Sequence, residues 1–194
     1  GIRYDLILRN VVTISTTFPR IIERFNDNYN LFNCQLGASY TFHRSNSLSF
    51  NTGYSNRNAG VHEIYSFGLH QGVSAIEIGS ANLNQEHSVK STIEYAYAPN
   101  TNFSFSVLGY YHHFFNYIHL VPTKESMLTI RGAFPVFEYQ QTKALIWGVD
   151  FLSSLTIANS LYAQLRINYV FGQNLDENIP LIFVQPPSIS LNLT

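Results

Sequence analysis

Apolar and polar residues alternate strictly over long stretches of this chain. In residues 160–171, "SLYAQLRINYVF", one set of alternate positions is almost wholly apolar and the other mostly polar. The apolar set comprises Leu161, Ala163, Leu165, Ile167, Tyr169 and Phe171. A period of two places alternate side chains on opposite faces of a β-strand, whereas a helix would mix the two sets. This segment is therefore predicted to be a strand with one apolar and one polar face.

The same test succeeds in most of the chain. Further alternating segments occur near residues 1–13, 30–42, 47–56, 86–98, 103–120 and 135–153, and a last strand begins near Ser188. Ordinary strands have about 5–6 residues, whereas a tilted strand crossing a bilayer needs about 9–11. The predicted strands are longer still, and many of their apolar faces end in Tyr or Phe. About eight long, membrane-crossing β-strands are expected.

The connections between these strands alternate in length. Short turn sequences occur at "HRSN" (43–46), "PNTN" (99–102) and "IANS" (157–160). Long irregular stretches are expected at about residues 14–30, 56–85, 121–134 and 172–187. Tight turns at one end and long loops at the other are typical of outer-membrane barrels. The expected fold is all-β, an antiparallel transmembrane β-barrel segment, and an open eight-stranded sheet with lipid-exposed edges suggests part of a larger barrel.

Composition supports this expectation and excludes other classes. Charged residues make up 12% of the 194-residue chain and aromatic residues 15%. A membrane barrel wall needs apolar, aromatic and small polar residues but few charges. The net charge of −1 offers no basic face for nucleic acid. A single cysteine, Cys34, excludes an internal disulfide, and no apolar run is long enough for a transmembrane helix.

Residues 53–97 resemble the mid-barrel signature of TonB-dependent outer-membrane receptors. The signature has an Arg near the end of a strand, then "ELYS", a "G-x-H" loop, "E-x-G" and "NL-x-x-E-x-S". The matching residues are Arg57, Glu63, Tyr65, Ser66, Gly68, His70, Glu77, Gly79, Asn82, Leu83, Glu86 and Ser88. One position departs from the pattern, because Ala59 stands where the family commonly has Pro.

The resemblance implies a 22-stranded barrel enclosing an N-terminal plug domain. Residues 1–194 would form part of this barrel, with the plug domain, the TonB-contacting region and the end of the barrel outside them. Such a receptor lies in the lipid of the outer membrane of a Gram-negative bacterium and imports a scarce nutrient, driven by the TonB complex. An iron–siderophore or other metal chelate is the expected ligand, and no cofactor is expected.

The histidine-rich stretch 61–72, "VHEIYSFGLHQG", allows two interpretations. His62, Glu63 and His70 could bind a metal or metal chelate, since imidazole and carboxylate suit several transition metals. The favoured interpretation is structural, with Glu63 accepting hydrogen bonds from backbone N–H groups and Tyr65 at the membrane interface. No resident metal site is predicted. His62, Glu63, Tyr65, His70 and His119 remain candidates for contact with the ligand.

Other histidines and charges are placed by the alternation. His112 and His113 are adjacent on one strand and are expected on opposite faces. His87 is expected on the outward face. Lys90, Glu94, Asp150, Gln164 and Arg166 are expected on the inward face, paired with each other or with a plug.

Two other function classes remain open. The chain could be a small complete outer-membrane barrel acting as a pore or an adhesin, or a soluble β-sandwich that binds a ligand. Enzyme activity is not expected, because neither a Gly-rich phosphate loop after a strand nor a G-x-S-x-G turn occurs in the sequence.

Overall fold

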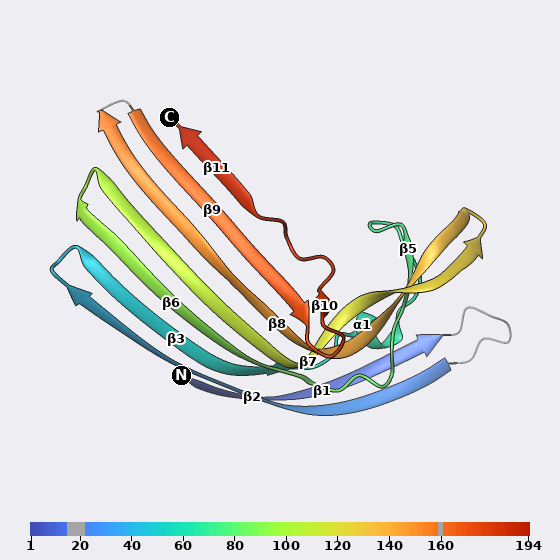
Figure 1. The fold of residues 1–194 in the computed structure, drawn as a ribbon. Coiled ribbons are helices and arrows are strands. Elements are labelled where there is room, and N and C mark those ends of the chain that lie inside the picture. Colours follow the sequence, from blue (N-terminus) through green and yellow to red (C-terminus); the bar gives the residue numbers. More distant parts are fainter. Residues whose placement is uncertain (15–21, 159–160) are drawn as a thin grey trace.

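The computed structural model describes residues 1–14, 22–158 and 161–194. Its main feature is one long, curved antiparallel sheet (Figure 1). Eight strands in the order β1-β2-β3-β6-β7-β8-β9-β11 form this sheet, which we call the wall. Its strands are β1 (Ile2–Ile14), β2 (Ile22–Phe42), β3 (Asn46–Arg57), β6 (Glu86–Asn100), β7 (Phe103–Thr129), β8 (Gly132–Ala158), β9 (Leu161–Asn174) and β11 (Ser188–Leu193). The prediction of about eight strands in one antiparallel sheet is confirmed.

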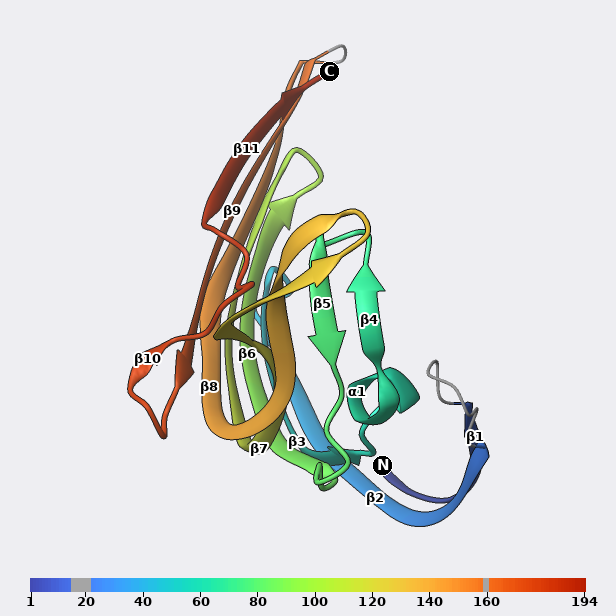
Figure 2. The same cartoon turned by 90° about the vertical axis from the view of Figure 1, so that its right-hand side faces the viewer.

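The remaining elements belong to the connections at one end of the wall. The connection from β3 to β6 contains the short helix α1 (Val61–Tyr65) and the hairpin β4 (Phe67–His70) and β5 (Ala75–Ile78). The connection from β9 to β11 contains β10 (Ile179–Pro180), which pairs with the end of β9. Figure 2 shows α1, β4 and β5 on one side of the wall, beside the bent end of the β7–β8 hairpin. No helix among the described residues is long and apolar enough to cross a membrane.

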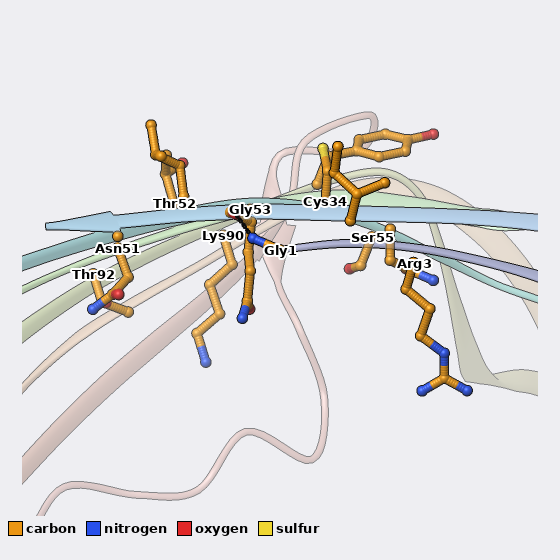
Figure 3. A pocket seen from close by; sticks show the side chains of 15 residues that line it. Gly1, Arg3, Cys34, Asn51, Thr52, Gly53, Ser55, Lys90 and Thr92 are labelled. Carbon is orange, nitrogen blue, oxygen red and sulfur yellow. Dashed lines mark hydrogen bonds between the residues drawn. The ribbon is translucent and has the colours of Figure 1, made fainter.

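The wall has one apolar and one polar face. Leu36 and Ile93 belong to the apolar face, and their exposed fractions are 73% and 53%. Figure 3 shows this division near β2 and β3, where Cys34 lies on one side of the ribbon and Arg3 and Lys90 lie on the other. A soluble sandwich would cover the apolar face with a second sheet, and the described residues contain none. The alternating pattern therefore predicted the two faces correctly.

Aromatic side chains form two bands on the apolar face. Near the short turns, Tyr97 contacts Phe105, with 5.6 Å between ring centroids. Near the long connections, Trp147 contacts Tyr169, also with 5.6 Å between centroids. The stretch of β7 from Phe105 to Phe115, in a strand tilted by about 45°, corresponds to a height of roughly 23 Å. This height approaches the ~25 Å apolar band of an outer-membrane barrel, which aromatic girdles flank at both interfaces.

Three of the four predicted long loops are wrong in their extent. Residues 121–134 are not an irregular loop, because β7 continues to Thr129 and β8 begins at Gly132. In the predicted loop 14–30, β2 already begins at Ile22, and residues 15–21 lie outside the described part. In the predicted loop 172–187, β9 continues to Asn174 and β10 follows. Register shifts at Phe114/Tyr117 and Pro122/Ser126 break the alternation in the first case.

The buried apolar residues gather where the connections pack on the wall. Ala59, Ile64 and Ile118 form one small cluster, and Phe114, Ala144 and Leu181 form another. Each cluster joins a connecting segment to a wall strand. The packed core of this structure therefore lies at the loop end, where it holds the connections in place.

Candidate functional site

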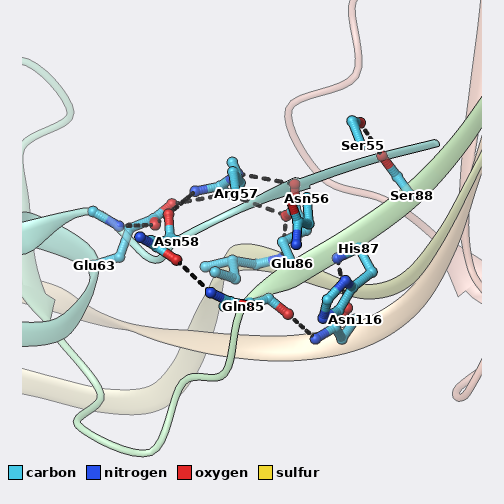
Figure 4. Close-up of polar contacts among 12 residues, drawn as sticks. Ser55, Asn56, Arg57, Asn58, Glu63, Gln85, Glu86, His87, Ser88 and Asn116 are labelled. Carbon is cyan, nitrogen blue, oxygen red and sulfur yellow. Dashed lines mark hydrogen bonds and ion pairs between the residues drawn. The ribbon is translucent and has the colours of Figure 1, made fainter. Parts of the chain in front are cut away.

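The connection 58–85 leaves and rejoins the wall through one cluster of charged side chains, which we call the Arg57 cluster (Figure 4). Arg57, the last residue of β3, donates to both carboxylate oxygens of Glu86 at 2.9 and 3.1 Å. It also donates to both oxygens of Glu63 in α1 at 2.9 and 3.2 Å. The guanidinium has several N–H donors in a fixed plane, which lets it engage two carboxylates at once. Arg57 thereby joins the exit, the helix and the return of the connection.

Glu86 extends the Arg57 cluster to a third wall strand. Its Oε2 accepts the backbone N–H of Ile118 in β7 at 2.8 Å. The β6–β7 ladder ends at the pair Ser88 and Phe114, so Ile118 lies beyond it and the Glu86 carboxylate accepts its N–H in place of a β6 backbone partner. Glu86 is only 6% exposed. A buried carboxylate costs much free energy without partners, and Arg57 and Ile118 supply them.

Glu63 fixes the start of α1. Its Oε2 accepts the backbone N–H of Gly60 at 2.6 Å, a hydrogen bond that the structural interpretation of this residue expected. Burial alone would raise the pKa of Glu63, but the hydrogen bonds from Arg57 and Gly60 and the Arg57 charge lower it below its ordinary value. Burial alone would likewise lower the pKa of Arg57, but hydrogen bonds to Glu63 and Glu86 raise it. Both groups are therefore charged at neutral pH.

The end of α1 packs directly against the strand that leaves the hairpin. The N–H of Gly79 donates to the carbonyl of Ser66 at 2.7 Å, and the N–H of Ser80 donates to the carbonyl of Glu63 at 2.9 Å. A Cβ atom at position 79 would lie 2.5 Å from the backbone carbonyl carbon of Ile64. Only glycine permits this approach, which explains the place of Gly79 in the motif.

The residue that stands in place of the family's proline lies inside the small core. Ala59 is 5% exposed and packs with Ile64 and Ile118. Its carbonyl accepts a hydrogen bond from Arg9 Nη1 of β1 at 2.6 Å. Arg9 is itself paired with Asp27 at 3.0 Å. The turn after Arg57 is thus held in place by a hydrogen bond from Arg9 in the neighbouring strand β1.

The β4–β5 hairpin is attached to the long β7–β8 hairpin. β5 pairs in parallel with β8 over residues 76–78 and 136–138. His70 Nδ1 lies 2.6 Å from Glu77 Oε1, and Tyr139 donates to the other oxygen of Glu77 at 3.4 Å. Burial, followed by the charges of Glu77 and Glu63, raises the pKa of Tyr139 to about 12, so the phenol keeps its proton. The His62 ring meets the edge of Tyr139 at 5.9 Å.

Several contacts of the site come from residues that the sequence did not single out. Gln141 donates to the carbonyl of Asn84 at 3.0 Å and accepts the N–H of Asn84 at 2.8 Å. The side chain of Asn116 accepts the N–H of His87 at 2.8 Å and donates to the carbonyl of Gln85. These amides hold the return of the connection against β7 and β8. Nothing in the local sequence marks them, because their partners lie 25 or more residues away.

The structure separates the histidines that the metal interpretation would combine. Glu63 is occupied by Arg57, and His70 is paired with Glu77. Within residues 1–14, 22–158 and 161–194, no three His, Cys, Asp or Glu side chains could hold one metal ion. His119 is partly buried and lines a pocket together with Tyr139, and its contact with the ligand stays a prediction.

The other motif residues support the same connection. Leu83 and Tyr65 pack against the Ala59–Ile64–Ile118 cluster, and the Tyr65 ring lies 5.0 Å from that of Phe25. Ser88 Oγ lies 3.0 Å from Ser55 Oγ across β3 and β6. Gly68 pairs with Glu77 in the hairpin, and Asn82 is exposed in the following turn. The motif as a whole builds one packed loop platform, and its charged groups pair with one another.

Known proteins give matches of two kinds. The family described as "TonB dependent receptor-like, beta-barrel" matches residues 1–194. Among solved structures, "Copper transporter OprC" matches with a TM-score of 0.69 and 14% identity over 87% of this chain. The siderophore receptor PirA from Pseudomonas aeruginosa matches with a TM-score of 0.61 and 14% identity over 99% of this chain. None of the curated proteins matches the sequence significantly.

The chain spans 25% of the length of the OprC structure and 36% of the PirA structure. At 14% identity the two structures support only the fold of this chain. The match to the family covers the whole sequence. This chain therefore belongs to the TonB-dependent receptor-like β-barrel family.

Proposed function

We propose that this chain supplies part of the barrel of an outer-membrane receptor that imports a metal chelate, such as an iron–siderophore, under the control of TonB. The observation that carries the proposal is the two-faced wall with aromatic bands on its apolar side, in a chain whose whole length matches the receptor family. Its apolar face would meet outer-membrane lipid, and its polar face would meet the lumen and a plug domain.

The open edges of the wall support the view that it is part of a larger barrel. Among the described residues, β1 and β11 each pair with a wall strand on one side only. Backbone groups at an open edge cannot be satisfied by lipid, so further strands must cover them in a membrane. We propose that residues 1–194 form one segment of such a barrel, with the plug domain supplied by other parts of the receptor.

The nature of the ligand is proposed from the neighbouring structures and the loop platform. The matched structures are described as a copper transporter and a siderophore receptor, and both descriptions concern metal. The platform of 58–85 and the extended β7–β8 hairpin lie at the end of the long connections, where an external ligand would arrive.

Uptake in cells tests the proposal. The gene would be deleted in its host, and the accumulation of radioactive iron, supplied as a panel of ferric siderophores, and of radioactive copper would be measured. We expect one chelate to lose most of its uptake on deletion and to regain it on complementation. The same uptake must disappear in a strain without TonB. Uptake that persists without TonB would instead identify a passive pore, and unchanged uptake of every metal would contradict the proposal.

A further inference from the structure

The outer part of the β7–β8 hairpin projects from the wall and depends on few contacts for its position. Its base is fixed, because the N–H of Ile118 donates to the buried carboxylate of Glu86. Beyond this base, residues 119–140 form what we call the arm. Three residue pairs join the arm to β5, where residues 76–78 lie beside residues 136–138. The position of the arm is therefore set by contacts that a small change can break.

A second contact reaches the arm from the segment between β10 and β11. The ring of Phe137 in the arm lies 6.4 Å from the ring of Phe183, measured between centroids, with 34° between the ring planes. This separation is within the range of favourable aromatic pairs. Figure 2 shows this segment and β5 on different sides of the arm. Phe183 and β5 therefore hold the arm from two directions.

The turn that carries Phe183 is anchored to the wall on both sides of this residue. Before it, Leu181 is only 8% exposed, and its N–H donates to the carbonyl of Gly172 at 2.9 Å. After it, Val184 lies so close to the wall that a Cβ atom at position 172 would be 2.8 Å from its side chain. Ile182 and Phe183 form the turn between these anchors. The Phe183 ring is therefore presented to the arm from a fixed base.

The backbone of Phe183 has a conformation that disfavours a side chain. Its φ angle is +61°, in the left-handed region where glycine is the usual residue and a bulky residue is an outlier. The side chain is 73% exposed, so burial does not account for it. Among the described residues, the one aromatic ring paired with Phe183 is that of Phe137. Strained residues of this kind cluster at switch regions, and here the strain accompanies a contact with a projecting arm.

The same features make the contact easy to break. The left-handed backbone at Phe183 opposes the contact, and a ring that stays largely exposed gains little from burial. The arrangement with the contact and the arrangement without it therefore lie close in free energy. A small differential interaction is then enough to shift the population from one to the other.

We propose that Phe183 is a latch that holds the arm over the polar face of the wall, and that its release lets the arm swing away together with β5. In the latched arrangement the arm, the segment 182–185 and the wall surround a space of about 550 Å³, which His112 and His119 line. Release of the latch opens this space. The inference rests on the proposed function only for the consequence that the opened space belongs to an import path.

Phe183→Gly tests the latch, because it removes the ring and the backbone strain together. In the intact protein in detergent micelles, amide hydrogen exchange in residues 132–139 should accelerate about two- to tenfold, as the loss of an aromatic pair implies. The N–H of Leu181 should exchange as slowly as before or more slowly, because the turn is relieved of strain. Faster exchange at both places would show that the ring only packs the turn. That result, or unchanged exchange in the arm, would overturn the proposal.

Two further variants locate the contact. Phe137→Ala removes the other ring and should accelerate exchange in the arm by the same factor. The double variant with Phe183→Gly should add nothing further, because all three variants lose one shared contact. Ile182→Ala is the matched control, since it shortens the neighbouring side chain of the same turn, and it should leave the arm unchanged. Additive effects of the two ring variants, or equal acceleration in the control, would refute a specific latch.

Spin labels measure the movement itself. One label is placed at Arg131→Cys in the turn of the arm and one at Thr101→Cys in the turn between β6 and β7, in a Cys34→Ser background. Phe183→Gly should add a second, longer population of distances between the labels, and a single unchanged population would contradict the proposal. These measurements require no transport. A failed latch therefore leaves the uptake result standing, and failed uptake leaves the latch result standing.

Discussion

Arg57 and Glu86 face each other across the last pair of the β3–β6 ladder and are joined by two hydrogen bonds of 2.9 and 3.1 Å. The chain leaves the wall at one of these residues and returns at the other. The exit and the return of the segment that contains α1 and the β4–β5 hairpin are therefore joined at one point. Four predictions follow from this anchor and from the wall that carries it, and each can be measured without knowledge of the ligand.

Replacement of Arg57 should loosen the connection 58–85. Arg57→Ala leaves the carboxylates of Glu63 and Glu86, 7% and 6% exposed as whole residues, without their cation. Loss of one partner from a fully buried pair costs about 3–5 kcal/mol, and the half-exposed guanidinium reduces this to about 1–3 kcal/mol. Amide hydrogen exchange at Ile64, Gly79 and Ser80 should accelerate by roughly 10- to 100-fold.

The matched control is Arg166→Ala on the polar face of β9. Among the described residues, the one hydrogen bond of the Arg166 side chain is donated by Nε to Gln164 Oε1, at 3.1 Å. Its removal should leave exchange in 58–85 unchanged. Equal exchange in Arg57→Ala and the unmodified protein would refute the anchoring role.

Acid should loosen the same connection through Glu63. The pKa of this carboxyl is lowered in the folded protein from an ordinary value of 4.5. The ionised form therefore stabilises the fold fully above about pH 4.5, and this contribution is lost as the pH falls through the lower, folded pKa. Exchange protection of Gly79 and Ser80, corrected for intrinsic rates, should decline below pH 4.5. Glu63→Gln should be less protected at neutral pH and should lose most of this pH dependence.

A methyl group at Gly79 should displace α1 from the hairpin. Its Cβ atom would lie 2.5 Å from the carbonyl carbon of Ile64 and 2.7 Å from the backbone nitrogen of Tyr65. Backbone atoms cannot rotate away, so Gly79→Ala should cost about 1–3 kcal/mol of local stability. Limited proteolysis should then cut within 58–85 faster than in the unmodified protein. Gly72→Ala is the control, because its Cβ atom would approach nothing closer than 3.6 Å.

An introduced charge should destabilise the barrel at one residue of β6 and be tolerated at the neighbouring residue. Ile93 belongs to the apolar face, and Thr92 lines the polar side near β3. Arginine on the lipid side of a barrel costs about 2–4 kcal/mol near the bilayer midplane, whereas arginine in the lumen is tolerated. Ile93→Arg should reduce the folded, heat-modifiable form on gels, and Thr92→Arg should not. Similar losses in both variants would contradict the assignment of the faces.

The long strands could be predicted because lipid on one face and water on the other impose strict alternation. Strand β9 was expected at 160–171 and is found at Leu161–Asn174 for this reason. The prediction of a loop at residues 121–134 is wrong because these residues lie beyond the aromatic bands, where contact with lipid does not impose an alternating pattern. The register shifts at Phe114/Tyr117 and Pro122/Ser126 then remove the remaining periodicity.

The site was only partly accessible to sequence reasoning. Arg57, Glu63 and Glu86 could be named through the family signature, but the signature did not say that they contact one another. The backbone N–H of Ile118 and the amide of Gln141 reach the site from strands distant in the chain. His112 and His119 come to one pocket only because their hairpin bends back, and a bend of that kind leaves no mark in local composition.

The separation of β3 and β6 along the chain has a consequence for the order in which the wall assembles. β2 and β3 are joined by the tight turn at residues 43–45, whereas β3 can pair with β6 only after the long connection 58–85 has closed. Closing the longer loop costs about 2 kcal/mol more chain entropy, by the logarithmic dependence on length. Arg57 and Glu63 are only six residues apart and can pair before that closure, which shortens the effective loop. The side chain that anchors the finished platform thereby also lowers the entropic barrier to zipping the two halves of the wall together.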